Sequence, residues 1–443
     1  MIKIAPEVIT IVMFSGILVG LLTGFYVAIV IGATGLIVGF FTIGPSVFEI
    51  IYARFFDIIT NYTLLAAPLF IFMGLMLESS GVAEKMYDAF YVWFGRGRGG
   101  LALVTILLGT ALATVVGNIA ASVIMLSLIA LPAMIKRGYD KGLAAGSVCA
   151  GGVLGIFIPP SIMLIIYAEM AGVSAGKMFM GAFLPGFVLS ALYCCHILVR
   201  CFLEPRVAPA IGEERAVPFV KKTTMLIKAA LPLTFLILSV LGVIFFGIAP
   251  PTEAAGAGGL AAVLLTIGYR RFNLKMLYKV AIQTIKLASM VYLIGGLASA
   301  FVGIFIATGA GAVIKTLLMN APGGTWGIFL VIMVAYFLLG FFLDWLPIMF
   351  LVVPITTPIY PALGFDPVWI GIMICLNLQA SFLTPPLAGA IFMLKGAASP
   401  ELDITMADVI RGVIPFVALV MVALALCVAF PQIILWLPSL MIQ

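Results

Sequence analysis

The sequence predicts an all-α, polytopic membrane protein, and three observations support this fold class. Of the 443 residues, 64% are hydrophobic and 9% are charged, and the mean hydropathy is +1.30. Soluble domains carry about 25% charged residues, so this chain holds more apolar surface than a water-soluble fold can bury. Apolar runs of roughly 20 residues recur, without the period-2 alternation of a membrane β-barrel. Because a helix satisfies its own backbone hydrogen bonds, the spans are expected to be helical.

The apolar runs predict the elements in chain order. Membrane spans are expected over 7–22, 25–43, 61–79, 178–203, 226–248, 252–269, 287–308 and 410–437. Short amphipathic pieces are expected over 47–60, 82–94 and 272–286. Two longer runs, 101–135 and 325–360, each predict a hairpin of two half-helices. The runs 142–171 and 367–397 predict helices that are broken at proline pairs.

The interruptions of these runs recur at matching positions in the two halves of the chain. Adding 226 to a residue number brings Asn118 onto Asp344 and Pro159-Pro160 onto Pro385-Pro386, with no gap between them. Two interrupted segments at corresponding positions indicate the binding site of a secondary transporter near the membrane midplane. Non-helical backbone at that depth survives only where it is buried in protein or lines a watery cavity.

The basic residues predict how the chain is threaded. With the N-terminus outside and each hairpin entering and leaving on one side, 19 of the 23 Lys and Arg residues fall in cytoplasmic loops. This agrees with the positive-inside rule. The first hairpin then enters from the cytoplasm and the second from outside, so the repeat is expected to be inverted. If each hairpin crossed fully, the basic loops 96–98 and 136–141 would lie on opposite faces and the bias would weaken.

The breaks offer groups for a cation and for an anion. A proline pair removes amide donors and disfavours helix in the preceding residue, which frees carbonyl oxygens upstream. Such oxygens can bind a hard cation, whereas an exposed helix N-terminus attracts an anion. Asp344 is the strongest single candidate, because a carboxylate at membrane depth is costly. The alternatives are a solvated loop for Asp344 and helix–helix contact for Asn118.

Other polar residues lie beside the second proline pair. Four precede it on one segment, where some must simply join helices: Asn377, Gln379, Ser381 and Thr384. Lys395 follows the pair and either meets a substrate carboxylate or extends to the inner surface, which we favour. Glu78 and Glu169 lie near the ends of spans and are expected at the membrane interface.

The composition argues against several other functions. The single histidine, His196, lies in an apolar run, and none of the six cysteines forms a CxxC pair, so neither an enzyme nor a metal site is expected. A Gly-Lys-Ser/Thr phosphate loop is absent, which argues against ATP-driven transport. The net charge of +6 reflects orientation in a lipid bilayer and not nucleic-acid binding. A channel remains an alternative, although paired hairpins favour alternating access.

Several motifs resemble the large membrane subunit of TRAP (tripartite ATP-independent periplasmic) transporters over nearly the whole chain. They are Ala67-Pro68-Leu69-Phe70-Ile71 with Gly74, 97–101 (GRGGL), 136–140 (KRGYD), 154–161 (LGIFIPPS), 183–186 (FLPG) and 251–254 (PTEA). The run 376–386 (LNLQASFLTPP) is similar to that of a subgroup associated with 2-oxo acids and other monocarboxylates. The chain departs from many relatives at Gly117-Asn118-Ile119, where their first tip is rich in serine.

The resemblance implies an inverted-repeat, elevator-type transporter of the bacterial inner membrane. Its function would be Na⁺-coupled, binding-protein-dependent import of an organic anion, a monocarboxylate or 2-oxo acid, with Na⁺ as coupling ion and no cofactor. The implied partners are a small four-helix membrane subunit and a periplasmic substrate-binding protein. The implied division is scaffold helices and an arm (1–60), a first repeat (61–203), a cytoplasmic linker (204–225), scaffold helices and an arm (226–286) and a second, inverted repeat (287–443).

The resemblance and the polar groups at the breaks together define the candidate site residues. The candidates for Na⁺ are Gly117, Asn118, Ile158, Pro159, Asp344, Gln379, Ser381 and Thr384. The candidates for the substrate are Asn118, Ser122, Pro160, Ser161, Asn377, Pro385, Pro386 and Lys395. The alternative function is a standalone elevator-type Na⁺/carboxylate symporter that needs no partner subunit.

Overall fold

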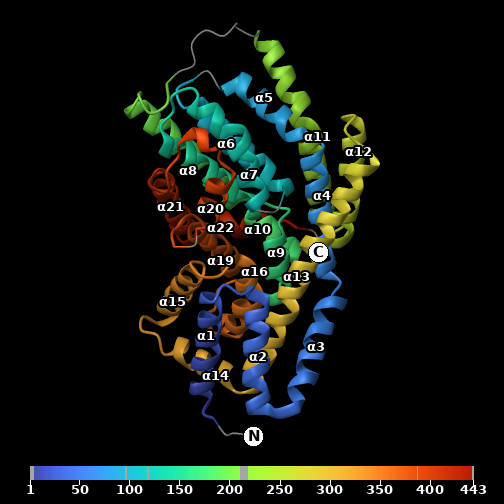
Figure 1. Ribbon diagram of the computed structural model, residues 1–443, viewed down its shortest axis with the longest axis vertical. Helices are drawn as coiled ribbons and strands as arrows, with labels where there is room; N and C mark the ends of the chain where they lie inside the picture. Colours follow the sequence, from blue (N-terminus) through green and yellow to red (C-terminus); the bar gives the residue numbers. More distant parts are fainter. Residues whose placement is uncertain (1–3, 95–96, 117–118, 210–217, 387, 442–443) are drawn as a thin grey trace.

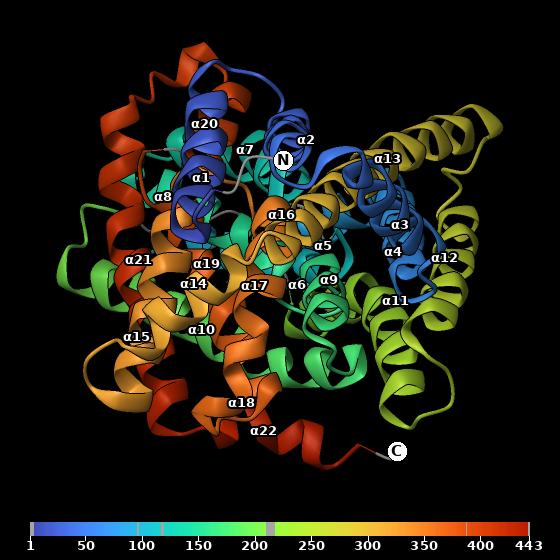
Figure 2. The same ribbon diagram turned by 90° about the horizontal axis from the view of Figure 1, so that it is seen from below.

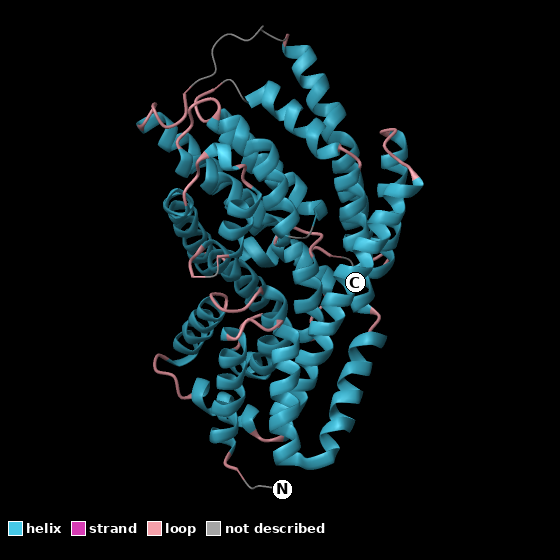
Figure 3. Cartoon of the chain, viewed as in Figure 1, coloured by secondary structure: helices cyan, strands magenta, loops and turns pink. Residues whose placement is uncertain are grey.

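The computed structural model describes residues 4–94, 97–116, 119–209, 218–386 and 388–441. Within these residues the regular elements are all helical (Figure 3). By length and composition, six helices of this described part can cross a membrane. A seventh span is added if the pair Thr63–Ser79 and Val82–Phe94, bent by 59°, counts as one. The composition therefore predicts the fold class correctly.

Among the described residues, the first half of the chain contains ten α-helices before the linker. They are α1 (Pro6–Leu22), α2 (Val27–Ile43), α3 (Val47–Thr60), α4 (Ala66–Ser79), α5 (Val82–Phe94), α6 (Gly100–Val116), α7 (Ile119–Ile135), α8 (Lys141–Val153), α9 (Ile162–Ala171) and α10 (Ala175–Leu203). The pair α6 and α7 forms the first predicted hairpin, and α8 and α9 are the two parts of the first broken helix.

The second half follows the same order with more interruptions. It contains α11 (Phe219–Phe245), α12 (Pro251–Gly268), α13 (Leu274–Ala307), α14 (Ala310–Met319), α15 (Gly324–Leu339), α16 (Trp345–Pro347), α17 (Val353–Thr356), α18 (Tyr360–Leu363), α19 (Pro367–Leu383), α20 (Gly389–Ala397), α21 (Met406–Ala429) and α22 (Gln432–Ser439). A π-helical turn, Ile348–Val352, separates α16 from α17.

The offset of 226 residues relates element boundaries well beyond the breaks. It carries the first residue of α7 onto that of α16, the first residue of α8 onto that of α19, and the last residue of α10 onto that of α21. Corresponding elements also meet: α4 contacts α13, and α8 contacts α19. The two halves are therefore structural repeats that pack on each other through corresponding helices.

Each half places its first two helices against the other half. α1 contacts α14 and α2 contacts α13, whereas α11 contacts α5 and α12 contacts α4. Figure 1 shows the first group in the lower part of the molecule and the second group in the upper part. In Figure 2, α8, α15 and α21 lie on one side and α3, α4, α11 and α12 on the other. The hairpins thus lie beside a separate group of helices that includes α3, α4, α11 and α12.

Two expectations about the second half are wrong in detail. The predicted amphipathic piece 272–286 and span 287–308 form one continuous helix, α13. In the first half the chain breaks at Asn61, whose side chain accepts a hydrogen bond from Leu64 N at 3.0 Å. The corresponding residue, Leu287, offers no such acceptor. The second arm of the second hairpin is also irregular, because prolines at 347, 354, 358 and 361 each remove an amide donor.

Glycines allow both hairpins to approach the broken helices closely. A Cβ added at Gly152 of α8 would collide with the Val123 side chain of α7. A Cβ added at Gly340, directly after α15, would collide with the Ser381 side chain of α19. Each hairpin is therefore held near the break of the helix beside it.

Candidate functional site

Three of the four predicted breaks lie in the described part of the chain, and Gly117-Asn118 lies outside it. The first broken helix is interrupted between α8 and α9, and the second between α19 and α20. Both proline pairs, Pro159-Pro160 and Pro385-Pro386, contain a cis peptide bond. In the second hairpin, α15 ends at Leu339 and Asp344 immediately precedes α16.

A cavity of about 270 Å³ lies where the hairpin tips meet the broken helices. The hairpins and broken helices contribute Ala120, Ala121, Asp344, Trp345, Leu346, Ile162 and Met393. The facing wall consists of Ile71, Leu75 and Glu78 on α4 and Leu287, Met290 and Val291 on α13. A larger groove of about 820 Å³ between α11 and α12 holds none of the predicted site residues. Position, and not volume, therefore identifies the candidate site.

Asp344 has the geometry expected of a functional carboxylate. Its side chain is exposed although its neighbours Leu343 and Trp345 are buried, and it lines the central cavity. It occupies the position before α16 but does not cap that helix. Its side chain therefore lies where a ligand in the cavity can reach it.

Two helix N-termini also face this cavity. Ala120 and Ala121 belong to the first turn of α7, and Ile162 is the first residue of α9. The unpaired amides and the dipole at a helix N-terminus attract negative charge. One small cavity thus combines a carboxylate, suited to a cation, with helix ends suited to an anion.

The first broken helix supplies backbone oxygens for a cation. Ile158, Pro159, Pro160 and Ser161 are buried. Among the described residues, no backbone amide donates to the carbonyl oxygens of 157–160. The Ser161 hydroxyl donates to the Ile156 carbonyl and so is not free as a donor. These carbonyl oxygens retain their capacity to bind a cation.

The polar residues of the second broken helix have different partners. Asn377 Nδ2 donates to Met333 O at 2.7 Å and joins α19 to α15, which is a structural role. The hydroxyls of Ser381 and Thr384 each donate to a carbonyl of their own helix at 2.8 Å. Pro385 and Pro386 are exposed, whereas the first proline pair is buried. The two breaks therefore differ in their access to solvent.

Two predicted site residues carry buried oxygens without a partner in the described structure. Gln379 Nε2 donates to Cys375 O at 3.4 Å, but Gln379 Oε1 has no hydrogen-bond partner. Ser122 Oγ, on α7, likewise has none. Burying a polar atom without a partner costs about 1–3 kcal/mol, so each marks a position where a ligand would stabilise the protein.

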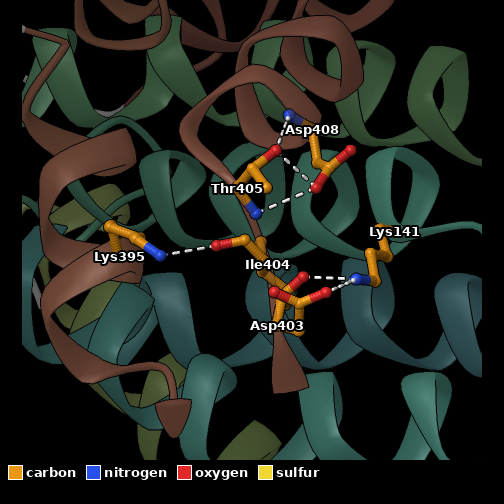
Figure 4. Close-up of polar contacts among 6 residues, drawn as sticks. All are labelled: Lys141, Lys395, Asp403, Ile404, Thr405 and Asp408. Atoms are coloured by element: carbon orange, nitrogen blue, oxygen red, sulfur yellow. Dashed lines mark hydrogen bonds and ion pairs between the residues drawn. The ribbon is translucent and has the colours of Figure 1, made fainter. Parts of the chain in front are cut away.

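Lys395, a predicted substrate residue, is not among the described residues that line this cavity. Its Nζ atom donates to Ile404 O at 2.5 Å. Lys141 Nζ contacts the Asp403 carboxylate at 3.0 Å in the same loop (Figure 4). Together the two lysines hold the connection between α20 and α21.

Glu78 lines the central cavity, although its place near the end of a span predicts a position at the membrane interface. Ile71, Leu75 and Glu78 follow the i, i+4, i+7 spacing of one helix face, which is the face of α4 that meets the hairpin tips. The available signal was a carboxylate within an apolar run, but its place near the end of that run suggested a solvated position.

An all-helical, multi-span fold with paired hairpins and broken helices around a central cavity is typical of secondary transporters. The YdaH transporter of Alcanivorax borkumensis has a similar fold, with a TM-score of 0.61 at 14% identity over 87% of this chain and 89% of that one. This likeness confirms the predicted fold class.

Residues 14–433 match the family described as tripartite ATP-independent periplasmic transporter, DctM component, and the chain belongs to this family. The C4-dicarboxylate large permease DctM of Pseudomonas aeruginosa is 30% identical over 87% of this chain and 88% of that protein. The ectoine large permease TeaC of Halomonas elongata is 29% identical over 95% and 96%. The expectation of a TRAP large subunit, a multi-pass permease of the bacterial inner membrane and not an enzyme, is confirmed.

Proposed function

We propose that this protein is the TRAP subunit through which an organic anion, a monocarboxylate or 2-oxo acid, enters the cell with Na⁺. The observation that carries the proposal is the central cavity, where Asp344 faces the N-termini of α7 and α9. A cation bound at Asp344 would offset the charge of an anion bound at the helix ends. Each ligand would then raise the affinity for the other.

We assign the cation to the breaks that surround the cavity. In the first broken helix the ligands would be the carbonyl oxygens of Ile158 and Pro159, together with Gly117 and Asn118 from the first tip. In the second half they would be Asp344, Gln379, Ser381 and Thr384. The unpartnered Gln379 Oε1 supports this assignment.

We assign the anion to the helix N-termini beside the cation. Asn118, Ser122, Pro160 and Ser161 would contribute from the first half, and Pro385 and Pro386 from the second. Asn377 would act indirectly, because its amide holds α19 against α15. The named relatives carry a C4-dicarboxylate and ectoine, so the choice of a monocarboxylate rests on the resemblance of the run 376–386 to that of the monocarboxylate subgroup.

Transport would follow an elevator motion. The hairpins and broken helices would move together and carry the cavity across the membrane. The helices assigned to 1–60 and 226–286 would act as the scaffold, with the N-terminus in the periplasm. Membership of the tripartite family implies a small membrane subunit and a periplasmic binding protein as partners.

Uptake by proteoliposomes tests this function. The purified subunit is reconstituted with its small membrane subunit and a candidate binding protein, and a carboxylate panel is offered with and without an inward Na⁺ gradient. Accumulation that needs both the gradient and the binding protein supports the proposal. Uptake without either partner would show a standalone symporter, and uptake independent of Na⁺ would refute the proposed coupling.

A further inference from the structure

We infer that Glu78 makes the central cavity selective for substrates with a single carboxylate on an apolar body, by excluding a second negative charge. This inference rests on the proposed function, because it assumes that the cavity holds the transported anion. It assigns a specificity role to a residue outside the hairpins and the broken helices.

The wall of the cavity is apolar apart from two carboxylates. Glu78 and Asp344 are the charged side chains among the described residues that line it, and both are acidic. Aliphatic, methionine and tryptophan side chains form the remainder. Such a surface favours the hydrocarbon part of a ligand through apolar burial.

The two carboxylates have different surroundings. Asp344 lies at a hairpin tip, beside the breaks to which the cation is assigned, so the bound cation would neutralise it. Glu78 lies on α4, outside the hairpins and the broken helices, and it also lines the cavity. It is therefore the carboxylate that the substrate meets away from the cation.

A bound monocarboxylate can place its charged end and its apolar body against different parts of this cavity. Its carboxylate lies at the N-termini of α7 and α9, and its apolar body contacts Ile71, Leu75 and Met290. Glu78 on α4 lines the same cavity of about 270 Å³. A second carboxylate on the ligand would share this cavity with Glu78, and like charges within one site disfavour binding.

Matched ligands that differ by one carboxylate test the inference. The probes are benzoate with terephthalate, and hexanoate with adipate, titrated onto the purified protein in saturating Na⁺ by calorimetry. We expect each monocarboxylate to bind at least about tenfold more tightly than its dicarboxylate partner. Glu78→Gln should reduce that ratio about tenfold by improving dicarboxylate binding, and Glu49→Gln, an exposed change on α3, should leave the ratio unaltered.

Three results of these titrations would contradict the inference. Equal or tighter binding of the dicarboxylate in both pairs, no binding of either monocarboxylate, or an unchanged ratio in folded Glu78→Gln would overturn the inference. The wild-type comparison needs no variant, so it stands even if Glu78→Gln does not fold. Na⁺-driven uptake of a dicarboxylate would refute the inference and keep the Na⁺-coupled import of an organic anion, whereas Na⁺-independent uptake would refute the proposed coupling itself.

Discussion

At the scale of single residues, Asp344 is the group on which cation binding depends most. Its exposed carboxylate lines the cavity next to buried neighbours, so it is accessible to a ligand there. We predict that Asp344→Asn folds normally and raises the Na⁺ concentration for half-maximal uptake by about tenfold or more. Asp403→Asn, an exposed change in the loop before α21, is the matched control. Unaltered Na⁺ activation in Asp344→Asn would remove this residue from the cation site.

Asp366 shows the opposite kind of carboxylate, one that stabilises the fold. Its Oδ1 atom accepts hydrogen bonds from Val368 N at 2.8 Å and Trp369 N at 3.2 Å, which caps α19. We predict that Asp366→Ala lowers the free energy of unfolding by about 1 kcal/mol. Thermal unfolding measures this change. Because Asp366 does not line the cavity, a shift in Na⁺ activation would contradict its structural role.

At the scale of elements, the approach of the second hairpin to α19 depends on Gly340. The helical backbone of Gly340 would accept a side chain, but its Cβ would collide with Ser381. We predict that Gly340→Ala lowers the free energy of unfolding by about 1–3 kcal/mol through overpacking. The double variant Gly340→Ala/Ser381→Gly should lose less stability than the single changes added together. Additive losses would show that the two residues do not constrain each other.

A side-chain contact also joins α9 to the junction between α3 and α4. Asn61 Nδ2 donates to Glu169 Oε1 at 2.6 Å, while Asn61 Oδ1 accepts from Leu64 N. If α9 moves with the hairpins, this hydrogen bond must break during transport. We predict that Glu169→Ala speeds hydrogen–deuterium exchange in the last turn of α9 by about tenfold, the effect of losing a charge-assisted bond. Glu401→Ala, an exposed change in the loop after α20, should have no such effect, and equal exchange in both variants would refute the contact's role.

At the scale of the whole molecule, the sequence predicts the positions of the helix breaks. It does not predict which other helices line the cavity beside them. The amino-acid sequence alone shows the proline pairs, the charged residue within an apolar run, and the fixed offset of 226 residues between the two halves. They place the hairpins over α6–α7 and α15–α18 within a few residues of the structure. The irregular second arm follows from its four prolines, although a hydropathy reading treats that arm as an ordinary half-helix.

The remaining part of the site depends on contacts between distant segments. Glu78, Met290 and Met393 become neighbours only when α4, α13 and α20 pack around the tips. Hydropathy assigns Glu78 to a span end and gives no sign of the helix that it faces. The direction of Lys395 similarly depends on the loop before α21, where the Ile404 carbonyl oxygen accepts a hydrogen bond from Lys395 Nζ. Pairings of this kind come from tertiary packing, which a single sequence does not display.

The central claim is that Na⁺ and an organic anion bind together in the cavity between the hairpin tips. The most direct test is the affinity of the purified protein for a transported carboxylate, measured across a range of Na⁺ concentrations, together with its affinity for Na⁺ at fixed carboxylate. We predict that each ligand raises the affinity for the other by the same factor, and that Asp344→Asn abolishes the effect. Carboxylate affinity that does not change with Na⁺ would contradict the shared site.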